Sequence, residues 1–316
     1  MPDKKPKFKP VYWSVLIFLV AELFMFAVAT RENGYLNANN IYVPPQPVQP
    51  IILWPQPATT SSTGVVTPAV PATSSIGFIL LYFASLIIVI GLVLFFIPLS
   101  ALKFLFRVIF AFLFAWGVFI LGVFWLPLIA AVIIALAAGI GWLFFPRVWL
   151  HNLVMIIAMA SVAAIFGRFV NPWTAMVLLL ALAIYDFFAV RFGYMLWMAQ
   201  KMSKSTTLPA FILPHHGNEW TSAVRQVNLD NVAETKPEER DYSILGGGDI
   251  AFPLLLTASI YFARGLGSAL LIALFCLGGL WTAYFIQSVF LKGKPMPALP
   301  PIAALALVSL LIILYA

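Results

Sequence analysis

Three acidic residues stand inside long apolar stretches of the chain: Glu22, Asp186 and Asp249. If these stretches cross a membrane, a carboxylate near the middle of one costs about 2.5–3.5 kcal/mol, so each acid needs a partner or a function. Basic partners are scarce, because Arg107 goes deepest into an apolar stretch and still lies near enough to its end to extend back to the interface. A proton shared between two of the acids therefore explains them better than ion pairs do.

Asp186 and Asp249 both carry a carboxyl group, so they could share one proton. The chemistry of two close carboxyl groups is well defined. Two carboxyls a few ångströms apart do not both ionise at low cost, so one keeps its proton near neutral pH. The ionised partner can take a proton from water as that water attacks a peptide carbonyl, and the protonated partner can donate to the carbonyl oxygen. The pair titrates as a unit, so the sequence does not assign the base to either aspartate.

The residues beside each acid are small. Gly246-Gly247-Gly248 directly precede Asp249, which removes every Cβ, lets another backbone approach and makes unusual φ/ψ values accessible. A flexible hinge or an uncapped helix start would explain the glycines equally well. Pro253 is expected to kink or break the helix just past Asp249. Three small residues near Asp186 permit close helix packing: Ala183, Ala189 and Gly193.

Composition identifies the medium in which these residues work. The chain has 316 residues, of which 63% are hydrophobic and 9% charged, whereas a soluble domain carries about 25% charged residues. We therefore predict a multi-pass integral membrane protein, all-α, whose surroundings are the lipid bilayer. The net charge of +7 does not indicate nucleic-acid binding, because the basic residues stand at the ends of apolar stretches. The single cysteine, Cys276, is expected to be a small buried apolar residue.

Nine stretches are long enough to cross a bilayer, which takes about 20 residues of helix. Each is predicted to form one transmembrane helix, and the first is expected to be a retained helix and not a signal peptide. The predicted spans are about 11–29, 76–97, 102–123, 126–145, 149–166, 173–192, 246–263, 266–291 and 298–316. Asp186 then lies about 9 Å from the end of the sixth span, and Asp249 lies near the start of the seventh. Because these two spans run in opposite directions, both acids fall at a similar depth.

The basic residues predict the orientation. With a cytoplasmic N-terminus, fifteen Lys and Arg residues fall inside and only Arg31, Arg168 and Arg264 fall outside, and the opposite orientation inverts that ratio. Nine spans then place the C-terminus outside the cytoplasm, and both Asp186 and Asp249 in the cytoplasmic half of the membrane.

We expect one transmembrane domain over residues 1–316, with spans one to six at about 11–192 and spans seven to nine at about 246–316. Residues 31–75 are rich in Pro, Ser and Thr and are predicted to be extended or disordered outside the cytoplasm. Residues 199–245 form a polar cytoplasmic loop. No internal repeat is visible, which weakens a transporter built from inverted halves.

Three short motifs lie in order on the sixth, seventh and ninth predicted spans. They are Tyr185-Asp186, Gly246-Gly247-Gly248-Asp249 and Pro297-Ala298-Leu299. Each motif alone is weak, but the ordered set resembles the presenilin and signal peptide peptidase family of GxGD intramembrane aspartyl proteases.

The resemblance implies that Asp186 and Asp249 are catalytic, that Tyr185 and Gly246–Gly248 belong to the active-site motifs, and that Pro297–Leu299 helps to bind substrate. It also implies hydrolysis of peptide bonds within transmembrane helices of other membrane proteins, without a cofactor. Pro300 and the predicted orientation favour the presenilin branch, whereas Asp249-Ile250 with Pro253 resembles the peptidase branch. The short cytoplasmic loop suits a prokaryotic, archaeal homologue in the cell membrane that acts without accessory subunits.

Other readings stay open. A proton-coupled transporter or channel would use the two aspartates as a relay, a prepilin-peptidase-like enzyme also carries Gly-x-Gly-Asp, and a silent scaffold would only bind membrane proteins. A homo-oligomer is compatible with the sequence. Glu22 is expected to hydrogen-bond a neighbouring helix. The pair His215-His216 has no third ligand at metal spacing, so no metal site is predicted and a solvated loop is expected. Ala131, Ala135 and Gly139 form a small-residue ridge suited to helix packing.

Overall fold

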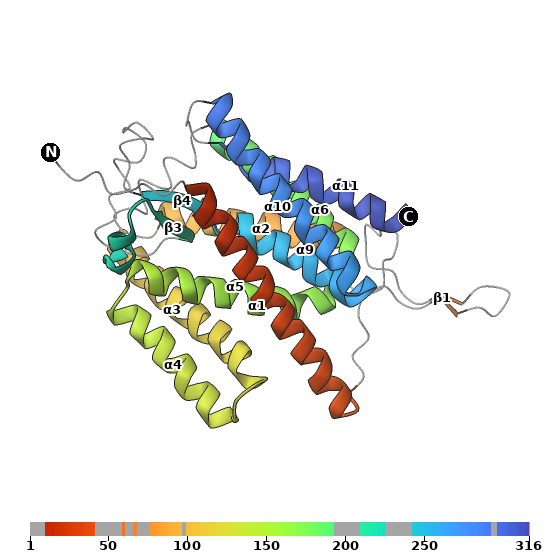
Figure 1. Cartoon of the computed structure of the whole chain (residues 1–316), viewed down its shortest axis with the longest axis horizontal. Coiled ribbons are helices and arrows are strands. Elements are labelled where there is room, and N and C mark those ends of the chain that lie inside the picture. Colours follow the sequence, from red (N-terminus) through yellow and green to blue (C-terminus); the bar gives the residue numbers. More distant parts are fainter. Residues whose placement is uncertain are drawn as a thin grey trace.

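The computed structural model describes residues 10–41, 59–60, 66–67, 76–96, 99–192, 209–224, 242–291 and 296–315. These ranges contain nine α-helices, one for each predicted span, so the protein is a mostly helical, polytopic membrane protein (Figure 1). The helices are α1 (Pro10–Ala38), α2 (Ile76–Phe96), α3 (Leu99–Val123), α4 (Leu128–Phe144), α5 (Val148–Phe169), α6 (Pro172–Arg191), α9 (Gly248–Arg264), α10 (Leu266–Val289) and α11 (Leu299–Tyr315). Within the described part of the chain, 5 helices are long and apolar enough to cross a membrane, namely α1, α3, α5, α6 and α10.

Local sequence explains where several helices begin and end. Asn171 caps α6 by accepting a hydrogen bond from the Trp173 amide at 2.8 Å, and Pro172 occupies the first turn, where its missing N–H costs nothing. Gly265 separates α9 from α10 with a φ of +87°, a left-handed backbone conformation that favours glycine.

The first helix is longer than its apolar stretch. The prediction ended it at about residue 29, but α1 continues to Ala38. Polar residues in the added turns find partners on other helices: Thr30 bonds the Tyr261 hydroxyl at 3.1 Å, and Arg31 donates to the Phe124 carbonyl at 3.1 Å. Residues 31–38 were therefore wrongly predicted as loop. Most of the remaining residues to 75 lie outside the described part of the chain.

Helix α5 lies at the centre of the bundle. In its apolar segment, 61% of the residues are buried, more than in any other helix that is long and apolar enough to span a membrane. The helix packs against α1, α3 and α9. Missing side chains allow these close contacts: a Cβ on Gly117 of α3 would lie 2.3 Å from the Ala158 Cα, and a Cβ on Gly167 would lie 2.4 Å from the Ala258 Cβ of α9. The predicted small-residue ridge of α4 is confirmed, since it is buried and its Gly139 packs on α3.

The all-α prediction was incomplete, because two short antiparallel strand pairs occur. One pairs β1 (Thr59–Thr60) with β2 (Val66–Thr67), and the other pairs β3 (Ala210–Pro214) with β4 (Tyr242–Gly246). In the second pair Ala210 lies opposite Gly246 and Ile212 lies opposite Ile244. The connecting segment holds a short 3-10 helix, η2 (Gly217–Thr221).

The segment predicted as a polar loop thus contains buried apolar structure. All five residues of β3 are buried, and Trp220 of η2 packs against Trp13 of α1 with ring centroids 4.7 Å apart. β4 runs directly into the start of α9, so the strand pair lies at the same end of the bundle as Asp249. Residues 193–208 and 225–241 of the predicted loop region lie outside the described part.

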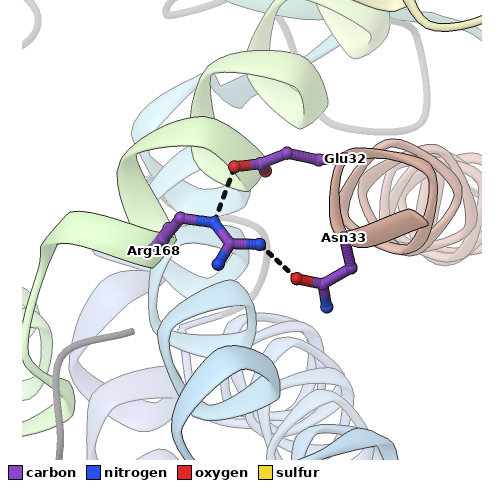
Figure 2. Close-up of polar contacts among 3 residues, drawn as sticks. All are labelled: Glu32, Asn33 and Arg168. Carbon is purple, nitrogen blue, oxygen red and sulfur yellow. Dashed lines mark hydrogen bonds and ion pairs between the residues drawn. The ribbon is translucent and has the colours of Figure 1, made fainter. Parts of the chain in front are cut away.

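A buried polar cluster joins α1, α5 and α9 at the opposite end of the bundle (Figure 2). Arg168 Nε donates to Glu32 Oε1 at 2.7 Å, and a second nitrogen of the same guanidinium donates to the Asn33 side chain. The guanidinium carbon also lies 4.2 Å from the centre of the Phe262 ring of α9. Because these residues come from the C-terminal parts of all three helices, α1, α5 and α9 run parallel.

Candidate active site

Asp186 lies near the C-terminal end of α6 and is buried, with 4% of its surface exposed. Its Oδ2 accepts a hydrogen bond from the Leu299 amide at 3.4 Å, and the Ala298 amide interacts with the same carboxyl. Leu299 begins α11, so Asp186 occupies a helix N-terminus, where free N–H groups and the helix dipole favour an anion. Ala183 and Ala189 are buried on α6, as their small size predicts, while Gly193 lies outside the described residues.

Asp249 lies in the first turn of α9, which gives it the second helix N-terminus at this end of the bundle. Its side chain turns back towards the preceding strand, because a Cβ on Gly246 would lie 3.0 Å from Asp249 Oδ2. The backbone of Gly246 hydrogen-bonds the Asp249 carboxyl, and that carboxyl interacts electrostatically with Asp186. The structure therefore brings the two acids into one site from two helices far apart in sequence.

Among the three glycines, Gly247 is the one that the lack of space requires, and none of the three has a positive φ. Gly247 has an ordinary helical conformation (φ −62°, ψ −32°), and Gly265 is the one described glycine with positive φ. A Cβ on Gly247 would lie 2.5 Å from Met159 Cε, 2.7 Å from Met155 Cε and 2.9 Å from the Pro209 carbonyl oxygen. A Cβ on Gly248 would meet only the Phe252 ring, at an ordinary 3.5 Å. None of these three glycines has a positive φ, so the unusual φ/ψ values that glycine makes accessible are not used here.

The segment Pro297–Leu299 leads into α11 beside Asp186. Leu299 is buried, and Pro297 and Ala298 are half-buried. Pro300 and Pro301 join the first turn of α11, where helices tolerate proline, whereas Pro297 lies before the helix. In α9, too, the helix continues through Pro253 without a break, although the Asp249 carbonyl loses the N–H that residue 253 would otherwise supply.

The other singled-out residues take positions around this site or away from it. Tyr185 is 40% exposed on α6. Glu22 is buried and accepts a hydrogen bond from Thr257 of α9 at 3.1 Å, as its predicted structural role requires. His215 is not solvated as predicted but buried, with its Nε2 2.8 Å from the Ser243 hydroxyl of β4. No group of three or more potential metal ligands occurs among the described residues.

Sequence reasoning missed the strand pair beside the two acids. The two outer edges of this strand pair differ in whether their backbone groups are already hydrogen-bonded. The backbone N–H and C=O of Ile212 both bond the Asn152 side chain of α5, so they point away from β4 and the pair Ile212–Ile244 is a non-hydrogen-bonded one. The backbone groups of Ile244 must then point away from β3, at the open edge of the sheet, which no other described strand pairs with. The apolar residues Ala210–Leu213, inside an otherwise polar segment, are the sequence signal that could have indicated β3.

Comparison with known proteins identifies the family and the fold. Residues 57–316 match the family model described as signal-peptide peptidase, presenilin aspartyl protease. Two solved structures of a presenilin family intramembrane aspartate protease share the fold. The one in space group C222 has a TM-score of 0.54 and 19% identity over 96% of this chain and 98% of the other. The one in space group P2 has a TM-score of 0.53 and 18% identity over 94% of each chain. No curated protein matches the chain.

The fold and the two carboxyls define a polytopic membrane protein with an acid pair at one end of its bundle. Since the family model covers most of the chain, the protein belongs to the signal peptide peptidase and presenilin family of intramembrane aspartyl proteases. It is accordingly a hydrolase embedded in the membrane by several apolar spans.

Proposed function

We propose that Asp186 and Asp249 together hydrolyse peptide bonds within the transmembrane helices of other membrane proteins. The observation that carries this proposal is the placement of the two carboxyls, which come from α6 and α9, each lie at a helix N-terminus and are near enough to interact electrostatically. A pair that shares one proton provides a base and an acid at the same time.

In the proposed reaction, the ionised aspartate accepts a proton from a water molecule as the water oxygen bonds to the carbonyl carbon of the scissile peptide. The protonated aspartate donates to the carbonyl oxygen, which gives a neutral tetrahedral gem-diol. Return of a proton to the amide nitrogen then releases the amine, and the carbon–nitrogen bond breaks. Neither aspartate is assigned the base, because the pair titrates together.

A transmembrane helix must unwind before its peptide bond is open to attack, and the open edge of β4 offers a partner for the unwound segment. Addition of a strand to a sheet edge supplies backbone hydrogen bonds that are independent of substrate sequence. β4 ends at Gly246, three residues before Asp249, so a strand paired with Ile244 would pass beside the acids. The half-buried Pro297 and Ala298 lie next to Asp186 and would contact the same substrate.

The positive-inside distribution supports a cytoplasmic N-terminus and an extracytoplasmic C-terminus, with both acids near the cytoplasmic face. We further propose that residues 1–316 act as one domain. The homologous architecture over nearly the full chain supports that organisation.

Cleavage of a purified single-span substrate in proteoliposomes tests the proposal. Wild type should produce fragments cut within the span, while Asp186→Ala and Asp249→Ala should produce none, and an aspartyl-protease transition-state analogue should block the wild type. Asp186→Glu should also lose nearly all cleavage, because it shifts the carboxyl by about one bond length in a reaction that depends on geometry. Cleavage by either alanine variant would refute the two-aspartate mechanism.

A proton relay is the competing use of the same two acids. A relay predicts that wild type dissipates a pH gradient across the vesicle membrane and that Asp186→Glu keeps part of that flux. Gradient dissipation that needs both aspartates, in vesicles that cut no substrate, would favour the relay.

A further inference from the structure

The first turns of α5 bind the strand pair that leads into Asp249. The Asn152 side chain makes two hydrogen bonds to one residue of β3: its Nδ2 donates to the Ile212 carbonyl at 2.6 Å, and its Oδ1 accepts from the Ile212 amide at 3.1 Å. A carboxamide has one donor side and one acceptor side, so Asn152 pairs with this strand edge as a third strand would. Asn152 is 2% exposed, and Ile212 is fully buried.

His151 strengthens the same attachment. Trp142 Nε1 donates to His151 Nδ1 at 3.2 Å, so the ring proton must be on Nε2, which then donates to the Ala210 carbonyl at 3.0 Å. Ala210 and Ile212 are alternate residues of β3 and therefore direct their backbone groups to the same edge. Two neighbouring side chains of α5 thus occupy the outer edge of β3.

Close contacts connect the α5–β3 attachment to the turn before Asp249. β3 pairs with β4 in a fixed register, and the Gly247 amide donates to the Pro209 carbonyl at 3.0 Å, just before β3. Gly247 also packs against Met155 and Met159, which follow His151 on one face of α5 at a spacing of four residues. Helix α5 therefore supports both the sheet and the glycine turn that places the Asp249 carboxyl.

We infer that Asn152 is a positioning residue for proteolysis, because its carboxamide holds β3 against α5 and thereby fixes Asp249 opposite Asp186. This inference rests on the proposed function of the two aspartates. Asn152 acts through the strand pair and Gly247, and it touches neither carboxyl in the structure.

A purely structural role would lower stability and leave the turnover of the folded enzyme unchanged. A positioning role lowers kcat in protein that remains folded, since a displacement of about 1 Å at reacting groups costs about 100-fold in rate. Asn152→Ala removes both hydrogen bonds. Asn152→Asp keeps the shape and the acceptor but sets an oxygen against the Ile212 carbonyl. Asn171→Ala is the matched control, because it removes the capping hydrogen bond to the Trp173 amide at the start of α6, at the other end from Asp186.

The experiment measures kcat and KM on a single-span substrate in proteoliposomes, below the unfolding temperature of each variant. Asn152→Ala and Asn152→Asp should lose at least about 10-fold in kcat, the aspartate variant no less than the alanine one, and should bind a transition-state analogue correspondingly less tightly. Asn171→Ala should keep wild-type kcat. A folded Asn152→Ala enzyme with kcat within about twofold of wild type overturns the inference, as does an equal loss in Asn171→Ala.

Two further outcomes are decisive. If Asn152→Ala does not fold, Asn152→Ser, which keeps a small polar side chain, replaces it; failure of both to fold assigns Asn152 to folding and overturns the positioning role. Asp249→Ala is measured in parallel. If it still cuts, the proposed function fails and the inference fails with it, whereas inactive Asp249→Ala beside fully active Asn152→Ala overturns the positioning role alone.

Discussion

Replacing Arg168 with methionine removes the cation from the cluster that ties together α1, α5 and α9. Glu32 is then left 6% exposed without its ion pair, and its second carboxylate oxygen already has no hydrogen-bond partner among the described residues. Removing one member of a buried ion pair destabilises a protein by about 3–5 kcal/mol. The lost contact with the Phe262 ring adds about 0.5–2 kcal/mol. We therefore expect Arg168→Met to lower the free energy of unfolding by about 3.5–7 kcal/mol.

The double variant Glu32→Leu, Arg168→Met separates the ion pair from packing. Apolar residues of similar volume often replace a buried pair at little cost. The double variant should therefore be more stable than either single variant, with a coupling free energy of at least about 2 kcal/mol in a double-mutant cycle.

Unfolding by a denaturing detergent, followed by tryptophan fluorescence, measures these free energies. Cleavage by folded Arg168→Met should stay near wild type at low temperature, because Phe262 is 13 residues from Asp249 along α9, or about 20 Å. A loss below about 1 kcal/mol in Arg168→Met, or a double variant as unstable as the sum of the singles, would refute the assignment of a buried, coupled pair.

Two further sets of variants test contacts near the acids. Gly247→Ala should lower the free energy of unfolding by about 1–3 kcal/mol, because its Cβ would lie 2.9 Å from the Pro209 carbonyl oxygen. A Cβ on Gly248 has room in the resting protein, so Gly248→Ala should keep wild-type stability. It should still lower cleavage, because the added methyl group would obstruct an approaching substrate backbone. Thermal unfolding in detergent compares the two variants, and equal losses of stability would contradict this difference between the glycines. Glu22→Gln keeps an acceptor for the Thr257 hydroxyl, so its cleavage rate should stay within about threefold of wild type, and an inactive but folded variant would assign Glu22 a role in the chemistry.

The transmembrane helices were predictable because hydropathy responds to one strong requirement, the satisfaction of backbone hydrogen bonds in lipid. Each of the nine predicted spans is a helix, and Asp186 and Asp249 lie on the helices expected. Helix α1 was cut short because hydropathy stops at the first polar residues, while the helix continues wherever those residues find partners, as Glu32 does with Arg168.

The strand pair and its supports were not predictable by the same means. β3 and β4 have five residues each and lie far apart in the chain, so no local hairpin signal exists. Asn152 and His151 looked like ordinary polar residues near a helix start, because their partners are backbone groups about 60 residues away. Likewise, the tight packing of Gly247 depends on Met155 and Met159, which no motif around Asp249 includes.

The helix that begins beside Asp186 is shorter than the thickness of the bilayer's hydrocarbon core. Helix α11 has 17 residues and spans about 25 Å, shorter than an average hydrocarbon core of about 30 Å. The apolar part of α1, about residues 11–29, spans about 28 Å and is close to that thickness. A bilayer that suits the apolar part of α1 is therefore too thick for α11 without local thinning. The short helix is also the one whose first amide binds Asp186. Under the proposed mechanism, lipid chain length therefore acts on the depth of α11 and, through Leu299, on the Asp186 carboxyl, so cleavage should have an optimal membrane thickness.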